Sequence, residues 1–245
     1  MQYSNIKNNS FINSFYNFFQ LMKPRVMSLV IFTCVVGLLI APNQINFITA
    51  TFALLSVAIG AGGAGALNMW FESDIDALMK RTCLRPIPTG KVSRNQALVF
   101  GIITSVFSVF SLYYFSNFLS AVMLTITILF YVLIYTIWLK QRTPQNIVIG
   151  GAAGAFPPII GWTIATGGIT LEPILLFLII FFWTPSHFWA LSLYKTEDYN
   201  NAKIPMLPVV SGIKTTKINI FVYAIILFFI SLTPYYFDYS GIIYL

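Results

Sequence analysis

Residues 48–67 read ITATFALLSVAIGAGGAGAL, a run with no charged side chain. A helix of about 20 apolar residues crosses the hydrocarbon layer of a bilayer, so this run predicts a membrane span. The whole chain has the same character, since 58% of its 245 residues are hydrophobic, 9% are charged and the mean hydropathy is +0.80. A soluble domain carries about 25% charged residues. The composition therefore predicts an all-α, polytopic bundle of transmembrane helices that uses the lipid bilayer as its solvent.

Apolar runs of this kind recur along the chain and are bounded by polar residues or by Pro and Gly. The seven predicted spans are residues 26–42, 48–67, 97–116, 118–139, 146–166, 171–193 and 217–236. They form one predicted transmembrane domain over residues 1–245, whose N-terminal part, residues 1–25, is a polar segment. Residues 241–244 have the character of an eighth span that has just begun, so the chain is expected to be shortened at its C-terminus.

The basic residues mark one side of this predicted bundle. All 14 of them fall before the first span or in alternate loops: Lys7, Lys23, Arg25, Lys80, Arg81, Arg85, Lys91, Arg94, Lys140, Arg142, Lys195, Lys203, Lys214 and Lys217. By the positive-inside rule, the N-terminus and these loops lie on the cytoplasmic side of the inner membrane. The net charge of +7 is thus explained by topology, and no nucleic-acid partner is expected.

The first acidic cluster follows the second predicted span. If that helix continues past Trp70, Asn68, Glu72 and Asp76 recur every four residues along one face. Carboxylates beside a membrane are unfavourable unless they are paired or bind a metal, and oxygen ligands of this kind suit Mg²⁺. In the alternative interpretation, Asp76 pairs with Lys80 and the remainder is a solvated helix end. The spacing alone favours neither.

The second acidic cluster follows the sixth predicted span and has the same orientation. It contains Glu197 and Asp198 beside Lys195. Two such clusters on one side of a bundle predict a site that holds Mg²⁺ and a diphosphate between them. Arg81, Arg85 and Lys195 are the expected phosphate donors, because guanidinium and ammonium groups form charge-assisted hydrogen bonds with phosphate.

Two further patterns have alternative interpretations. Gly60, Gly62 and Gly65 match a nucleotide-binding pattern, but small residues inside a membrane span favour close helix packing instead. His187 is the only histidine. Its side chain is expected either to hydrogen-bond to a neighbouring helix or to contact a bound substrate, including as an axial ligand to an iron porphyrin.

Several strings resemble those of a known family. They are NMWFESDIDALMKRT at residues 68–82, RPIPTG at 85–90, WTPSHFWAL at 183–191 and IPMLP at 204–208, with Lys23-Pro24-Arg25 before the first span. Together they resemble the protohaem IX farnesyltransferase branch of the UbiA-type intramembrane prenyltransferases, and the likeness covers nearly the whole chain. It implies a fold of nine spans and a Mg²⁺-dependent enzyme that transfers farnesyl from farnesyl diphosphate to a vinyl group of haem B, giving haem O.

The resemblance also implies roles for individual residues. Asn68, Glu72 and Asp76 would hold one Mg²⁺, and Glu197 and Asp198 a second. Arg81, Arg85 and Lys195 would bind the diphosphate, and His187 and Trp189 would contact haem. Haem A synthase or oxidase assembly factors are the protein partners that it suggests.

This chain departs from the broader family's pattern at two places. Glu72 stands where the family usually has Asp, and Ala202 stands where its second motif commonly repeats Asp. Three alternative functions stay open: a UbiA-type enzyme acting on a quinone precursor or another ring acceptor, a membrane transporter, and an inactive shortened homologue.

Overall fold

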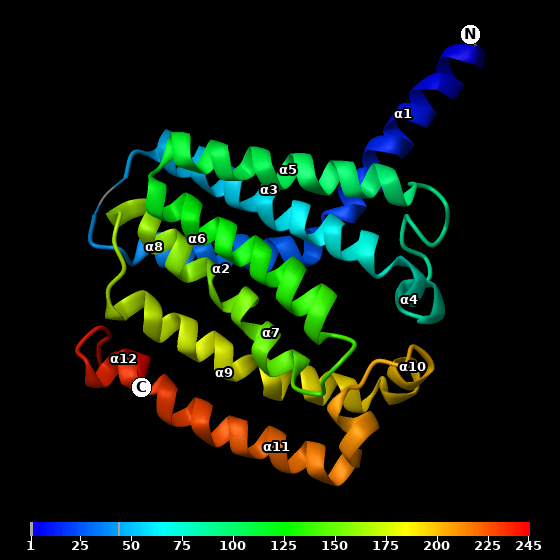
Figure 1. Cartoon of the computed structure of the whole chain (residues 1–245). Coiled ribbons are helices and arrows are strands. Elements are labelled where there is room, and N and C mark those ends of the chain that lie inside the picture. Colours follow the sequence, from blue (N-terminus) through cyan, green and yellow to red (C-terminus); the bar gives the residue numbers. More distant parts are fainter. Residues whose placement is uncertain (1, 44) are drawn as a thin grey trace.

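The computed structural model describes residues 2–43 and 45–245, with side chains from residue 12 onwards, and all its regular structure there is helical (Figure 1). The elements are α1 (Gln2–Leu21), α2 (Pro24–Leu39), α3 (Phe47–Phe71), α4 (Ser73–Leu78), α5 (Arg94–Phe115), α6 (Phe118–Leu129), η1 (Phe130–Leu139), α7 (Asn146–Ala155), α8 (Pro157–Thr166), α9 (Leu171–Leu193), α10 (Thr196–Asn201), α11 (Leu207–Ser231), α12 (Thr233–Tyr236) and η2 (Ile242–Tyr244).

Six helical stretches of the described chain are long and apolar enough to cross a membrane. They are α3, α5, α6 with η1, α7 with α8, α9, and α11 with α12. Residues Ile12–Leu21 and Pro24–Leu39 form a pair bent by 57°, which makes a seventh candidate if it is counted as one span. The prediction of an all-α bundle of several membrane spans is confirmed.

The helix boundaries differ from the expected ones at both ends of the chain. The polar segment 1–25 contains helix α1, whose side chains up to residue 11, including Lys7, lie outside the described residues. Helix α11 begins at Leu207, ten residues before the expected start of the last span at 217, and bends at Gly212, where φ is +78°. Lys214 and Lys217 made this first part look like a loop, but Pro208 lies in the first turn, where proline favours helix initiation.

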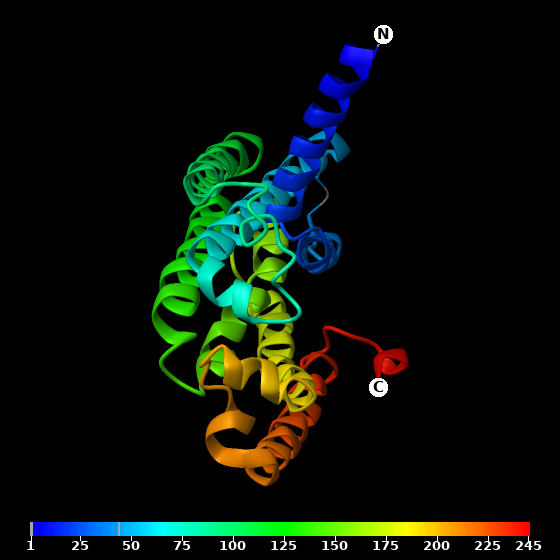
Figure 2. The ribbon, with the colours of Figure 1, turned by 90° about the vertical axis from the view of Figure 1, so that its right-hand side faces the viewer.

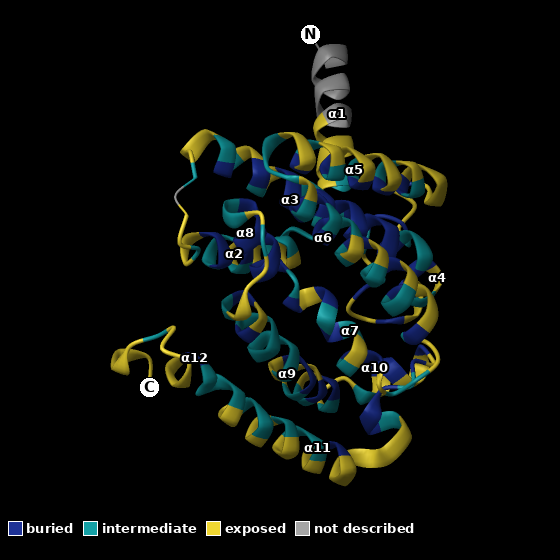
Figure 3. Cartoon of the chain, turned by 60° about the vertical axis from the view of Figure 1, so that its left-hand side comes forward, coloured by how far each residue is buried: buried dark blue, intermediate teal, exposed yellow. Residues whose placement is uncertain are grey.

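The second half of helix α3 is largely buried, as the dark blue in much of its ribbon in Figure 3 shows. Its glycines bring neighbouring helices close. A Cβ atom at Gly60 would lie 2.7 Å from Ser108 Oγ on α5, and one at Gly65 would lie 3.4 Å from the carbonyl oxygen of Leu21 on α1. Small residues at such contacts let helix backbones approach. The interpretation of the α3 glycines as packing residues is therefore confirmed.

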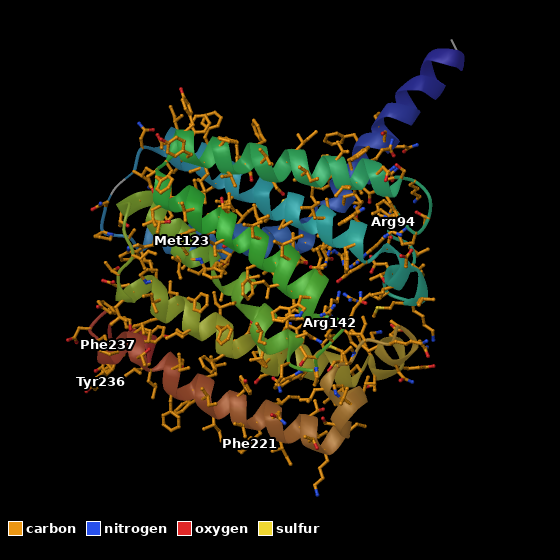
Figure 4. All side chains as sticks on the ribbon, in the orientation of Figure 1. Arg94, Met123, Arg142, Phe221, Tyr236 and Phe237 are labelled. Carbon is orange, nitrogen blue, oxygen red and sulfur yellow. The ribbon has the colours of Figure 1, made fainter. Side chains whose placement is uncertain are left out.

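The loops that contain the acidic clusters lie together at one end of the bundle, here called the charged end. It comprises Lys23 and residues 72–93, 140–145 and 194–206, and Figure 2 views the molecule from this side. Arg94 and Arg142 lie at this end in Figure 4, whereas Tyr236 and Phe237 lie at the opposite end. The fold thus gathers loops that are far apart in the sequence at the same end.

Candidate active site

Asn68, Glu72 and Asp76 line up on one helical path at the charged end. The helix hydrogen bonds continue across the junction of α3 and α4, since the amide of Glu72 donates to the carbonyl of Asn68 at 2.9 Å and that of Asp76 to Glu72 at 2.8 Å. The three residues are only 1%, 2% and 3% exposed. The predicted spacing is therefore present, and all three oxygen-bearing side chains point into the protein.

Each of these side chains contacts a basic side chain from another segment. Lys140 Nζ lies 2.6 Å from Glu72 Oε1, and Arg85 Nη1 donates to both carboxylate oxygens of Asp76 at 2.8 and 2.7 Å. Lys23 Nζ donates to Asn68 Oδ1. The partner of Asp76 is Arg85, so the alternative interpretation, in which Asp76 pairs with Lys80, is wrong.

The buried charges change the proton affinity of the two lysines. Burial and the positive charges of Arg85 and Lys140 lower the pKa of Lys23 to about 7, against the opposing effect of Glu72 and Asp76. Burial also acts to lower the pKa of Lys140, but the charge of Glu72 and its hydrogen bond outweigh it, so this pKa is raised. Lys140 therefore stays an ammonium ion at neutral pH.

An unusual helix places Lys140. Residues Phe130–Leu139 form a π-helix, in which the amide of Lys140 donates to the carbonyl of Tyr135 five residues earlier. π-helical segments are rare and frequently lie at functional sites. On this helix Thr136 accepts a hydrogen bond of 2.9 Å from Asn68 Nδ2, so η1 contacts two members of the α3–α4 row.

Sequence reasoning missed Lys23, Lys140 and Thr136 as members of the site. Both lysines were counted only as markers of topology. The available signal was their position, because Lys140 directly follows the apolar run 118–139 and Lys23 lies three residues before the run 26–42, where a long side chain can reach the bundle interior. Thr136 gave no signal, since a threonine within an apolar run is ordinary.

The remaining first-cluster residues are open to solvent. Asp74 is exposed and pairs with Arg94 at 3.0 Å. Arg81 is also exposed. Neither side chain belongs to the buried row formed by Asn68, Glu72 and Asp76.

The second cluster divides between a buried and an exposed carboxylate. Asp198 is buried, whereas Glu197 and Lys195 are exposed. The cluster adjoins the first one, because Met79, which follows α4, packs in one apolar cluster with Tyr199 of α10. The structure thus brings the two acidic loops together, as expected, and singles out Asp198 rather than Glu197 as the inward-facing group.

The described residues contain no group of three or more His, Cys, Asp or Glu side chains arranged around one point. A Mg²⁺ ion here would use the amide oxygen of Asn68 with one or two carboxylates and complete its coordination with phosphate oxygens and water. That set is ordinary for Mg²⁺, which rarely has an all-protein cage. The metal-binding roles of Asn68, Glu72, Asp76 and Asp198 stay predictions.

His187 and Trp189 do not converge. The His187 ring is exposed on α9 and stacks on Trp183 with centroids 4.3 Å apart. Trp189 is fully buried and meets the Tyr223 ring of α11 edge-on at 5.4 Å. No hydrogen bond joins His187 to a neighbouring helix among the described residues, contrary to one of the two expectations.

The sequence profile of the UbiA prenyltransferase family matches residues 30–245. The chain belongs to this family. It is 66% identical to the protohaem IX farnesyltransferase of Pelagibacter ubique over 232 residues, which cover 95% of this chain and 77% of that protein. It is 59% identical to the protohaem IX farnesyltransferase of Bartonella bacilliformis over 229 residues, 94% of this chain and 74% of that protein. The predicted resemblance is confirmed, and with it the prediction of a prenyltransferase rather than a transporter.

Solved structures share the fold at low sequence identity. A structure of digeranylgeranylglyceryl phosphate synthase superposes with a TM-score of 0.77 at 19% identity, covering 94% of this chain and 80% of that one. A UbiA homologue from Archaeoglobus fulgidus bound to geranyl diphosphate and Mg²⁺ superposes with a TM-score of 0.74 at 17% identity, covering 92% and 79%. The UbiA fold of this chain is therefore confirmed.

Proposed function

We propose that this chain transfers the farnesyl group of farnesyl diphosphate to a vinyl group of protohaem IX, which makes haem O. Relatives that carry the name of this activity match the chain at 66% and 59% identity. The observation that carries the chemistry is the buried row of Asn68, Glu72 and Asp76 facing Lys23, Lys140 and Arg85 at one end of an apolar bundle.

The row suits a magnesium diphosphate because its ion pairs can be exchanged. Without ligand, the charges of Glu72 and Asp76 are balanced by Lys140 and Arg85. In the complex, the carboxylates and Asn68 would hold Mg²⁺, with Asp198 from the neighbouring loop. The released cations would then bind phosphate oxygens, joined by Arg81 and Lys195 at the exposed rim. Glu197 would not be a ligand of this Mg²⁺, but would lie near a second Mg²⁺ if one binds.

The reaction needs a stabilised leaving group and a dry place for the cation. The bond between C1 of the farnesyl group and the diphosphate oxygen breaks, and the electron pair leaves with the diphosphate. Mg²⁺ supplies Lewis-acid stabilisation of that charge when bound, and fixed cations add to it. The vinyl π electrons then bond to C1, and the vinyl carbon left positive takes up water and releases a proton. The apolar helices keep water from the allylic cation before this step.

The haem side of the proposal rests on α9. The exposed His187–Trp183 stack presents a flat aromatic surface of the kind that packs against a porphyrin. Trp189 is buried against α11 and would support that helix rather than touch haem. The same proposal places the charged end at the cytoplasmic face, by the positive-inside rule. Contact with haem A synthase or oxidase assembly factors stays a prediction.

The test is an assay in membranes with haem B, farnesyl diphosphate and Mg²⁺, in which haem O is detected by chromatography and mass spectrometry. Product is expected, and it should disappear with EDTA and in Asp76→Asn. The matched control is Asp74→Asn, two residues away but exposed and paired only with Arg94, which should stay active. Loss in both variants, or product that persists in EDTA, would contradict the proposed site. Prenylation of a quinone precursor instead of haem would contradict the proposed acceptor.

A further inference from the structure

Two aromatic rings lie on the π-helix beside the proposed diphosphate site. The Tyr131 and Tyr135 rings stack with centroids 5.6 Å apart and planes 26° apart. Lys140 Nζ lies 6.0 Å from the Tyr135 centroid and 2.6 Å from Glu72. The two rings therefore continue inward, along the span, from the charged end of the bundle.

The π-helix is what aligns these groups. Each of its turns contains more residues than an α-helical turn, as the hydrogen bond from the Lys140 amide to the Tyr135 carbonyl shows. Thr136 meets Asn68, and Lys140 meets Glu72, from the same helix. Tyr135 immediately precedes Thr136 in this run, and Tyr131 lies one turn deeper.

The other side of Tyr135 is closed by a glycine. A Cβ atom at Gly150 of α7 would lie 2.1 Å from Cδ2 and 2.6 Å from Cε2 of the Tyr135 ring. The ring therefore rests directly on the α7 backbone, and any larger residue would displace it. Both tyrosine rings remain half-buried, and no described residue hydrogen-bonds to either hydroxyl. The aromatic pair is thus held from behind and keeps accessible surface.

We infer that Tyr135, backed by Tyr131, is the aromatic wall that shields the allylic cation formed at C1 of the prenyl group. This rests on the proposed function. With the diphosphate held by Lys140 and Arg85, the first carbons of the apolar chain must lie on the membrane side of these cations, where the two rings are. When the C1–O bond breaks, the electron pair goes to the diphosphate and the positive charge spreads over C1 and C3. The negative face of an aromatic ring stabilises such a charge.

The decisive measurement separates ring electronics from ring shape. Tyr135→Phe should retain more than half of kcat, whereas Tyr135→Leu should lose about 10- to 30-fold with little change in the KM of farnesyl diphosphate, as about 2 kcal/mol of cation–π attraction implies. Phenylalanine carrying one, two or three ring fluorines at position 135 should lower log kcat stepwise, because each fluorine weakens the negative face. A merely structural ring would give a flat series, and that result would overturn the inference.

A second readout does not depend on the acceptor. Farnesyl diphosphate labelled with ¹⁸O at the bridging oxygen is incubated with Mg²⁺ and mesohaem, which lacks vinyl groups, and movement of the label reports reversible ionisation. The exchange rate should follow the same fluorine series. Exchange without haem O production would contradict only the proposed acceptor. No exchange by the unmodified chain would overturn the proposed function and this inference together.

Discussion

The ion pair between Glu72 and Lys140 permits a quantitative test of the site in the ligand-free protein. The two charges lie 2.6 Å apart, and their side chains are 2% and 20% exposed. At an effective dielectric constant of about 20, unit charges at this separation attract by about 6 kcal/mol. Desolvation of both groups offsets much of this. We expect a net coupling of about 2 kcal/mol.

The coupling is measured as a double-mutant cycle. Lys140→Met leaves a nearly inaccessible carboxylate without its partner, and we expect it to lower the free energy of unfolding by about 3 kcal/mol. Glu72→Gln leaves the partly exposed ammonium near an amide oxygen, so about 2 kcal/mol is expected. The double variant should lose about 3 rather than 5 kcal/mol, because neither unpaired charge remains. Unfolding is followed by circular dichroism during SDS titration of the protein in dodecyl maltoside micelles.

A surface pair from the same region provides the control. Asp74 and Arg94 are 81% and 48% exposed at their side chains, with a separation of 3.0 Å. Solvent screening should hold the coupling in the cycle of Asp74→Asn and Arg94→Met to about 0.5 kcal/mol or less. If the Glu72–Lys140 cycle gave a value no larger than this control, the interpretation of that pair as a buried, coupled part of the site would be refuted.

The same titration tests packing at two further places, and the transferase assay tests the proposed haem surface. Gly161→Ala should destabilise the protein by about 1–3 kcal/mol, since its Cβ would lie 1.9 Å from the carbonyl oxygen of Cys34. Gly154→Ala should be tolerated because open space surrounds that position. Equal effects of the two substitutions would contradict the α2–α8 contact. Trp189→Ala should lose about 3–5 kcal/mol because the side chain is fully buried. His187→Ala should leave stability unchanged and raise the KM for haem B, and an unchanged KM would remove His187 from the proposed haem surface.

The sequence by itself determined the class of fold and the positions of the two acidic clusters, which follow the second and the sixth predicted span. Apolar runs of membrane-spanning length and the distribution of basic residues are properties of the chain alone, because each helix must satisfy its backbone hydrogen bonds within itself in lipid. The i, i+4, i+8 spacing of Asn68, Glu72 and Asp76 is equally local. These features were therefore predictable without knowledge of any tertiary contact.

Only the tertiary structure decided which charges meet. The partner of Asp76 is Arg85 rather than Lys80, and Lys140 reaches Glu72 from a helix that lies 68 residues later in the chain. The π-helix that delivers Lys140 has no signature in a uniformly apolar run. The packing also decided that Asp198 and Trp189 are buried, whereas Glu197 and His187 are exposed. Such choices depend on how neighbouring helices rotate and pack against one another, which local periodicity does not specify.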